Sequence, residues 1–273
     1  MDSDQRRLLV TMPLHAITST YGEPGLRERF ALEIAALPDA DRGLPERALE
    51  LASRLHAADR RDREPYVNHL LRVAIRIMSH YRVSDPDVVA AALLHDAVED
   101  HPAELAGGAD PSQRAALAVL ATEFGPRVAE LVAAVTNPPW APDRDEHEQY
   151  REHVADSLQR SPWARVIKAS DFTDNGVGLI HTTGPRLRRL ARKYAPLVPI
   201  LRDLIARPDT PLDAGVKEHI LSQLDRAEDR FAAVLRLTRG GRRLSWCPPL
   251  PVIGRPSRRL AEGRGRNRKR GCW

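Results

Sequence analysis

One apolar segment, Val88–Leu94, limits the choice of fold more than any other part of the sequence. It is apolar on nearly every side of a helix, which is typical of a helix in the centre of a domain. Asp85-Pro86 supplies an N-cap followed by proline at the first helical position. We predict one helix over residues 88–100, ended with the help of Pro102, with four ionisable side chains near its end: His95, Asp96, Glu99 and Asp100.

The rest of the body has the same helical spacing of apolar residues and no alternating strands joined by hairpin turns. The sequence therefore predicts an all-α fold. Further helices are expected over residues 26–37, 45–58, 66–81, 112–123, 126–136, 145–160, 162–172, 185–206 and 212–238.

Charge is unevenly distributed along the 273 residues, although the net charge is only +5. Residues 239–273 hold eleven of the 42 basic residues and one acid, Glu262, so the remainder is net acidic. This distribution argues against a uniformly basic domain that coats nucleic acid. The Gly- and Pro-containing tail lacks periodicity, which predicts disorder. It is either a solvated extension or a contact for nucleic acid or the ribosome.

The sequence has no feature of a membrane or secreted protein. No apolar run approaches the roughly 18–20 residues that a bilayer span needs, and the first residues lack a signal-peptide pattern. The two cysteines, Cys247 and Cys272, both lie in the tail, so neither a disulfide framework nor a thiolate zinc site holds the body together. We expect no membrane contact and a cytoplasmic location.

The ionisable end of the central helix indicates a cation site, because unpaired buried charge is costly. Glu99 follows His95 by four residues and Asp100 follows Asp96 by four, so each pair shares a helix face. Imidazole nitrogen and carboxylate oxygen suit a divalent ion such as manganese, iron or zinc. His69 and Asp171 are the natural residues to complete the ligand set, leaving positions for water and substrate.

The order His69, His95-Asp96, Asp171 resembles the HD phosphohydrolase superfamily. The motifs R-x4-P-Y-x2-H, ALLHDxxED and KxxDxxxN, within about residues 45–204, are more closely similar to the hydrolase domain of the RelA/SpoT-homologue alarmone enzymes. Those enzymes remove the 3′-pyrophosphate from (p)ppGpp, and the chain resembles their small, stand-alone members.

The resemblance implies a role for each matching residue. His69, His95, Asp96 and Asp171 would bind Mn²⁺, with other divalent metals as alternatives. Glu99 and Asp100 would position the attacking water. Substrate contacts would come from Arg60, Tyr66 and Asn175. Their own positive charge makes Arg61 and Lys168 further candidates for contact with a polyanionic substrate. The structural alternatives are a solvated basic turn at Arg60, an ion pair at Lys168 and a helix C-cap at Asn175.

The chain departs from the family pattern at two places. Asp62 and Arg63 stand where the family usually has Ser and Gly, and Phe172-Thr173-Asp174 replaces a common Arg-Leu-His. Because the Ser contributes to guanine contact in the family, two other interpretations stay open. One is an HD hydrolase of another nucleotide, such as a deoxynucleotide or NADPH. The other is a non-catalytic module that binds a nucleotide or nucleic acid.

The predicted organisation has four parts. Residues 1–42 form an N-terminal helical extension, and residues 43–206 form the HD hydrolase domain, a helical bundle. Residues 207–238 form a C-terminal helix packed on that domain. Residues 239–273 are the basic, disordered tail.

Overall fold

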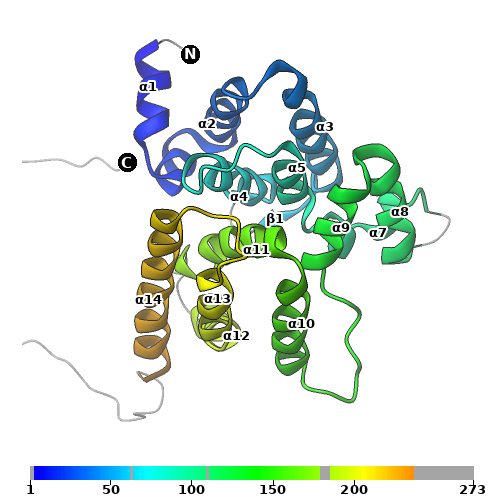
Figure 1. Cartoon of the computed structure of the whole chain (residues 1–273), viewed down its shortest axis with the longest axis vertical. Helices are drawn as coiled ribbons and strands as arrows, with labels where there is room; N and C mark the ends of the chain where they lie inside the picture. The colour runs from blue at the N-terminus through cyan, green and yellow to red at the C-terminus, as the bar shows by residue number, and fades with distance from the viewer. Residues whose placement is uncertain (1–2, 62–63, 109–110, 179–184, 237–273) are drawn as a thin grey trace, which may run out of the picture. The chain divides into compact units, whose positions relative to one another are not determined.

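The computed structural model describes residues 3–61, 64–108, 111–178 and 185–236 (Figure 1). The predicted basic tail lies outside these residues. The first helices are α1 (Ser3–Thr11), α2 (Leu14–Ala35), α3 (Asp39–Leu55), α4 (Val67–Ser79), α5 (Pro86–Leu94), α6 (Ala97–Asp100) and α7 (Pro102–Leu105). The others are α8 (Gln113–Phe124), α9 (Pro126–Val135), α10 (Glu146–Arg160), α11 (Pro162–Asn175), α12 (Pro185–Tyr194), α13 (Leu197–Ala206) and α14 (Ala214–Arg236). The predicted all-α fold is confirmed.

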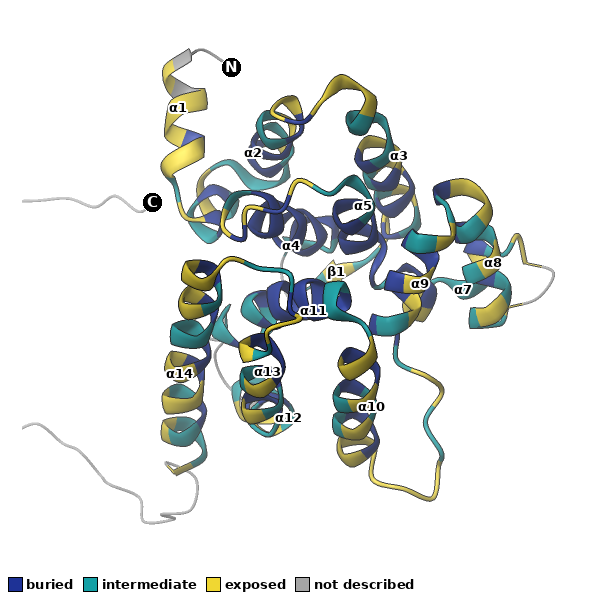
Figure 2. Cartoon of the chain, in the orientation of Figure 1, coloured by how far each residue is buried: buried dark blue, intermediate teal, exposed yellow. Residues whose placement is uncertain are grey.

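Helix α5 is the buried centre that the sequence predicts. Each residue from Val88 to Leu94 has 0% of its surface exposed. The helix packs against α3, α4 and α9, and α4 in turn packs against α2 and α11. Figure 2 shows α4, α5 and α11 as the most continuously buried helices. The predicted N-cap is also present, because Asp85 Oδ1 accepts from the backbone N–H of Asp87.

The predicted single helix over 88–100 is wrong, because the chain breaks at His95 and Asp96 between α5 and α6. The Nδ1–H of His95 donates to the carbonyl of Ala92 at 2.8 Å. A side chain thereby bonds a carbonyl near the end of α5, where last-turn carbonyls need partners from outside the helix. The break separates the His95-Asp96 pair from the turn that carries Glu99 and Asp100.

Proline explains two other differences from the predicted helices. The segment 185–206 forms α12 and α13 with Pro196 between them, since proline lacks an N–H for a helix interior. Pro102 does not simply end a helix: it is the first residue of α7. The predicted helix over 26–37 belongs to the longer α2, whose backbone is interrupted at Gly22 with φ of 62°.

The structure also contains a minimal hairpin that the sequence pattern did not predict. Strands β1 (Arg60–Arg61) and β2 (Glu64–Pro65) are antiparallel, with Arg60 opposite Pro65 and Arg61 opposite Glu64. Strands of two residues are too short to show an alternating pattern. The hairpin holds the two arginines directly before α4.

No helix among the described residues is long and apolar enough to cross a bilayer. The predicted domain boundaries at 42/43 and 206/207 stay predictions, and α3 runs across the first of them.

The first turn of α11 is fixed by one buried arginine. Arg165, with a fully buried side chain, donates to the carbonyls of Leu158 and Gln159 at 2.7 and 2.9 Å. It also bonds Thr210 Oγ1 at 3.0 Å and both carboxylate oxygens of Asp209 at 2.8 and 3.0 Å. The guanidinium therefore ties α11 to the end of α10 and to the loop before α14.

Replacing Arg165 with methionine should lower the free energy of unfolding by about 2 kcal/mol, because the buried Leu158 carbonyl and Thr210 hydroxyl lose their donor. Urea denaturation of the full chain measures this. Arg160→Met is the matched control: its pair with Asp156 is exposed on both sides, and its loss should cost less than about 0.5 kcal/mol. Equal losses in the two variants would contradict the assignment.

Candidate metal centre

Four side chains from three segments converge at the inner ends of α4, α5 and α11. His69 lies in the first turn of α4, Asp171 lies in α11, and His95-Asp96 form the break after α5. His69 Nε2 is 3.4 Å from Asp171 Oδ1 and 3.7 Å from Asp96 Oδ2. His95 Nε2 is 3.0 Å from Asp96 Oδ2 and 3.8 Å from Asp171 Oδ1. The structure thus brings together all four predicted ligand residues.

In both imidazoles the Nδ1 atom is hydrogen-bonded, which leaves Nε2 as the atom that can bind a metal. Each Nδ1 is engaged, that of His95 by the Ala92 carbonyl and that of His69 by Asp174 at 2.8 Å. Each Nε2 is buried and forms no hydrogen bond of regular geometry, although carboxylate oxygens of Asp96 and Asp171 lie 3.0–3.8 Å away. Buried polar atoms without a partner are uncommon and need an explanation. A divalent cation between the two Nε2 atoms and the carboxylates supplies one, so these residues fit a metal.

The electrostatics of the cluster also favour a positive charge between its carboxylates. Burial opposes a charged imidazole, yet the carboxylates of Asp96 and Asp171 raise the pKa of His95 to about 10. Burial likewise opposes ionisation of Asp171, but Lys168 and the imidazoles outweigh it and hold its pKa well below the usual range. The carboxylates of the cluster therefore stabilise a positive charge on His95, and the same carboxylates would stabilise a bound cation.

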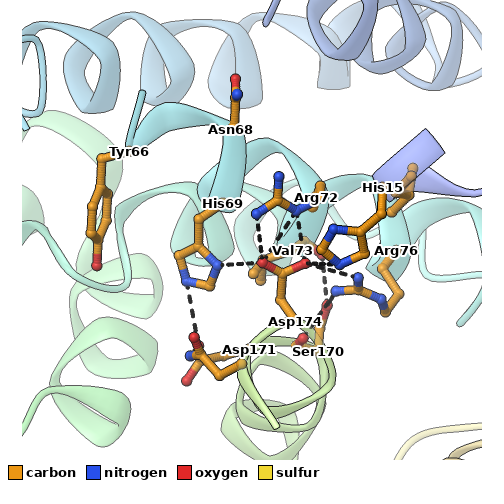
Figure 3. Close-up of polar contacts among 12 residues, drawn as sticks. His15, Tyr66, Asn68, His69, Arg72, Val73, Arg76, Ser170, Asp171 and Asp174 are labelled. Atoms are coloured by element: carbon orange, nitrogen blue, oxygen red, sulfur yellow. Dashed lines mark hydrogen bonds and ion pairs between the residues drawn. The ribbon is translucent and has the colours of Figure 1, made fainter. Parts of the chain in front are cut away.

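A second layer, which the ligand prediction did not include, centres on Asp174. Besides His69, its carboxylate accepts from Arg72 Nε at 2.9 Å and from Arg76 Nη2 at 3.1 Å (Figure 3). Burial opposes its ionisation, but Arg72 and His69 outweigh burial and keep the pKa of Asp174 well below its usual range. A carboxylate on the Nδ1–H of a metal-ligating histidine fixes the ring and raises its basicity.

The signal for this layer is present in the sequence. Asp174 lies three residues after Asp171, and Arg72 and Arg76 lie three and seven residues after His69 on one face of α4. The sequence analysis treated Asp174 only as a departure from the family motif. Arg72 also pairs with Glu64 of β2 at 2.8 Å, so the same guanidinium anchors the hairpin that carries Arg60 and Arg61.

The predicted water-positioning carboxylates, Glu99 and Asp100, lie on α6. Both Oε atoms of Glu99 accept from Asn137, from its backbone N–H at 3.1 Å and its Nδ2 at 3.0 Å. Asp100, the last residue of α6, is exposed. Desolvation and the charges of Asp96 and Glu99 raise the pKa of Asp100 to about 6.

Three predicted substrate contacts touch the ligand carboxylates instead. The Tyr66 hydroxyl donates to Asp96 Oδ2 at 2.7 Å. Lys168 Nζ donates to Asp171 Oδ2 at 2.9 Å, and Asn175 Nδ2 donates to Asp171 Oδ1. The structural alternative for Lys168 was an ion pair with a surface acid, but its partner is this buried aspartate. The Oδ1 atom of Asn175 is buried and makes no hydrogen bond.

The two hairpin arginines differ in exposure: Arg60 is exposed and Arg61 is half-buried. Burial opposes the charge of Arg61, but Asp174 and nearby tyrosines outweigh it and raise its pKa. Asp62 and Arg63, the residues that depart from the family pattern, lie outside the described residues.

A second His/Asp group adjoins the site. Asp59 Oδ2 accepts from His56 Nδ1 at 2.8 Å and from His101 Nε2 at 2.6 Å. The His56 ring stacks on Tyr66 with ring centroids 4.7 Å apart. These contacts hold the Tyr66 ring whose hydroxyl reaches Asp96.

Comparison with known proteins agrees with this geometry. The HD-domain family matches residues 48–159, which cover α5, the His95-Asp96 break and His69. The fold and site therefore define an HD-domain protein.

Individual relatives identify a narrower family within the HD-domain proteins. MESH1 of Xenopus tropicalis, a guanosine-3′,5′-bis(diphosphate) 3′-pyrophosphohydrolase, is 31% identical over 136 residues, 48% of this chain and 67% of its own. Human MESH1 is 34% identical over 128 residues, 45% of this chain and 63% of its own. The structure of a metazoan ortholog of SpoT that hydrolyses ppGpp matches with a TM-score of 0.51 and 26% identity, over 67% of this chain and 94% of that one. The chain belongs to the MESH1/SpoT-like family.

The extent of these matches differs between relatives. The match spans 18% of a probable GTP pyrophosphokinase of Mycobacterium leprae and slightly less than two thirds of the fly, human and mouse MESH1 proteins.

Replacing Asp174 with asparagine should weaken Mn²⁺ binding about 10–100-fold, because His69 keeps a hydrogen-bond acceptor but loses the charge behind its ring. Isothermal titration of the full chain measures the affinity, and circular dichroism checks the helices. Asp156→Asn, which removes an exposed carboxylate of α10, should bind Mn²⁺ as the unaltered chain does. Unchanged affinity in Asp174→Asn would show that Asp174 only pairs with the arginines.

Proposed function

We propose that the chain is a Mn²⁺-dependent phosphohydrolase that removes the 3′-pyrophosphate from (p)ppGpp, giving GDP or GTP and pyrophosphate. The observation that carries the proposal is the buried cluster in which the two Nε2 atoms lie 3.0–3.8 Å from carboxylate oxygens of two aspartates. The named activity of the family members supports the choice of substrate.

We propose His69, His95, Asp96 and Asp171 as the metal ligands. Two imidazoles and two carboxylates are a donor set that suits Mn²⁺ as well as iron or zinc. When bound, the ion would polarise a phosphoryl oxygen and activate a water. Lys168 and Asn175 hold the two oxygens of Asp171, and Tyr66 holds Asp96, so these three side chains orient the ligands.

In the proposed reaction, water attacks the phosphorus of the pyrophosphate that is bonded to O3′. The P–O3′ bond breaks, O3′ gains a proton and pyrophosphate departs. The carboxylate of Asp100, with its raised pKa, accepts the proton of the water. Glu99, held by Asn137, is the second carboxylate that orients this water.

The hairpin arginines, Arg60 and Arg61, supply positive charge for a polyanionic substrate in a body that is otherwise net acidic. Tyr66 offers a ring at the same edge of the site. Direct substrate contacts of Lys168 and Asn175 stay predictions, as do a cytoplasmic location and binding of nucleic acid or the ribosome by the basic tail.

The purified chain with Mn²⁺ should release pyrophosphate from ppGpp, and Asp96→Asn should reduce this rate at least about 1,000-fold, because a lost ligand removes metal-assisted chemistry. Asp156→Asn is the matched control and should keep full activity. Deoxynucleotides and NADPH are assayed in parallel. Turnover of one of those without ppGpp hydrolysis would refute the substrate and retain the metal centre. An active Asp96→Asn variant would refute the centre itself.

The rate should depend on pH through Asp100. A proton acceptor works only when ionised, so kcat/KM should fall about tenfold per pH unit below its pKa. The raised pKa of about 6 is the upper limit for this midpoint, because a cation at the nearby ligands lowers it. Asp100→Asn should be slow and lack this acidic limb. A variant that retains the limb would assign it to another group.

A further inference from the structure

A cavity of about 970 Å³ lies beside the candidate metal centre, on the other side of Asp174. The first turns of α2 and α14 and the C-terminal end of α4 form its walls. Its polar lining includes His15, Arg76, His80, Arg82, Asp213 and His219. Figure 3 shows His69 on one side of Asp174 and His15 with Arg76 on the other. The volume suits a small organic ligand of nucleotide size.

The cavity lining holds more basic than acidic side chains. Among its described lining residues, Asp213 is the only acid, against two arginines and three histidines. Desolvation, and then the charges of Arg76 and His219, lower the pKa of His80 to about 4, so its imidazole is neutral near pH 7 and offers a hydrogen-bond donor instead of a charge. Arginine and imidazole donors arranged around a cavity are suited to phosphate oxygens. Apolar residues such as Leu14 and Val216 complete the lining and suit the organic part of a ligand.

The cavity rim contains a strained residue. Arg82 has φ of +56°, and it is the only residue other than glycine with positive φ among the described residues. Glycine or asparagine takes this conformation at lower cost at the end of a helix. An arginine with its side chain at the cavity, kept in a costly conformation, is consistent with use of its charge there.

Arg76 connects the cavity to the metal centre. Its Nη2 donates to Asp174 Oδ1 at 3.1 Å, while Asp174 Oδ2 accepts from His69 Nδ1 at 2.8 Å. His15 Nε2 lies 3.7 Å from Asp174 Oδ1, the oxygen that accepts the hydrogen bond from Arg76. An anion that draws Arg76 toward the cavity leaves more of the Asp174 charge directed at His69. The His69 Nε2 then becomes a stronger donor to a metal.

We propose that this cavity binds a small phosphorylated molecule and that its occupancy strengthens metal binding at His69 through Arg76 and Asp174. The site is separate from the proposed catalytic ligands. The second half of the proposal rests on the proposed metal centre, and the first half does not.

The test uses guanosine 5′-monophosphate and, separately, pyrophosphate as probes in isothermal titration of the full chain. The informative variant is Arg82→Gly combined with His219→Ala. Glycine accepts the positive φ, and both side chains lie outside the proposed catalytic residues. This variant should weaken binding of at least one probe about tenfold or more, whereas Arg60→Ala at the proposed substrate site should not. Arg226→Ala, an exposed arginine further along α14, controls for net charge.

The coupling is measured by titrating Mn²⁺ with and without guanosine 5′-monophosphate, because pyrophosphate itself chelates Mn²⁺. A saturating probe should lower the Kd for Mn²⁺ at least about fivefold in the unaltered chain and leave it unchanged in the cavity variant. Probe binding that is equal in both chains, or absent at millimolar concentration, would overturn the proposed site. Probe binding without a change in Mn²⁺ affinity would overturn the coupling. Neither result depends on whether the chain hydrolyses ppGpp.

Discussion

The buried carboxylate of Asp174 is the constraint on which the centre of this protein depends. A carboxylate without solvent is costly unless positive donors surround it. Here the donors come from α4, through His69, Arg72 and Arg76, and they compensate Asp174 only when α4 and α11 meet in one register. The same register places His69 Nε2 3.4 Å from Asp171. Packing of the two helices and formation of the candidate site are therefore a single event.

Arg72 extends this dependence to the hairpin. Its guanidinium bonds Asp174 and Glu64 together, so the position of β2, and of the basic residues opposite it, follows from the charge balance in the core. A two-residue hairpin has too few backbone hydrogen bonds to be stable alone. The basic edge of the site is thus held by a side chain of α4.

The sequence predicts the parts of the structure that follow from periodicity and local caps. The apolar run from Val88 and its Asp85 cap identify the central helix, and the spacing of His69, His95-Asp96 and Asp171 identifies residues that do converge. It does not reveal the break at His95, because that depends on one side chain bonding the Ala92 carbonyl. Nor does it reveal the role of Asp174, whose partners on α4 meet it only in the folded chain. For Lys168, the spacing of three residues to Asp171 on α11 permits an ion pair, but burial of that pair is seen only in the folded chain.

The break at His95 has a consequence for how ligand substitutions are interpreted. His69 lies within a regular helix. Backbone hydrogen bonds hold the course of α4, so a substitution of the His69 side chain leaves that course unchanged. The Nδ1–H of His95, in contrast, bonds the carbonyl at the very point where α5 ends. A small apolar residue there would remove a donor atom and also release the chain to continue as helix. Of the two histidines, a substitution of His69 therefore tests metal coordination alone, whereas a substitution of His95 also changes the course of the main chain.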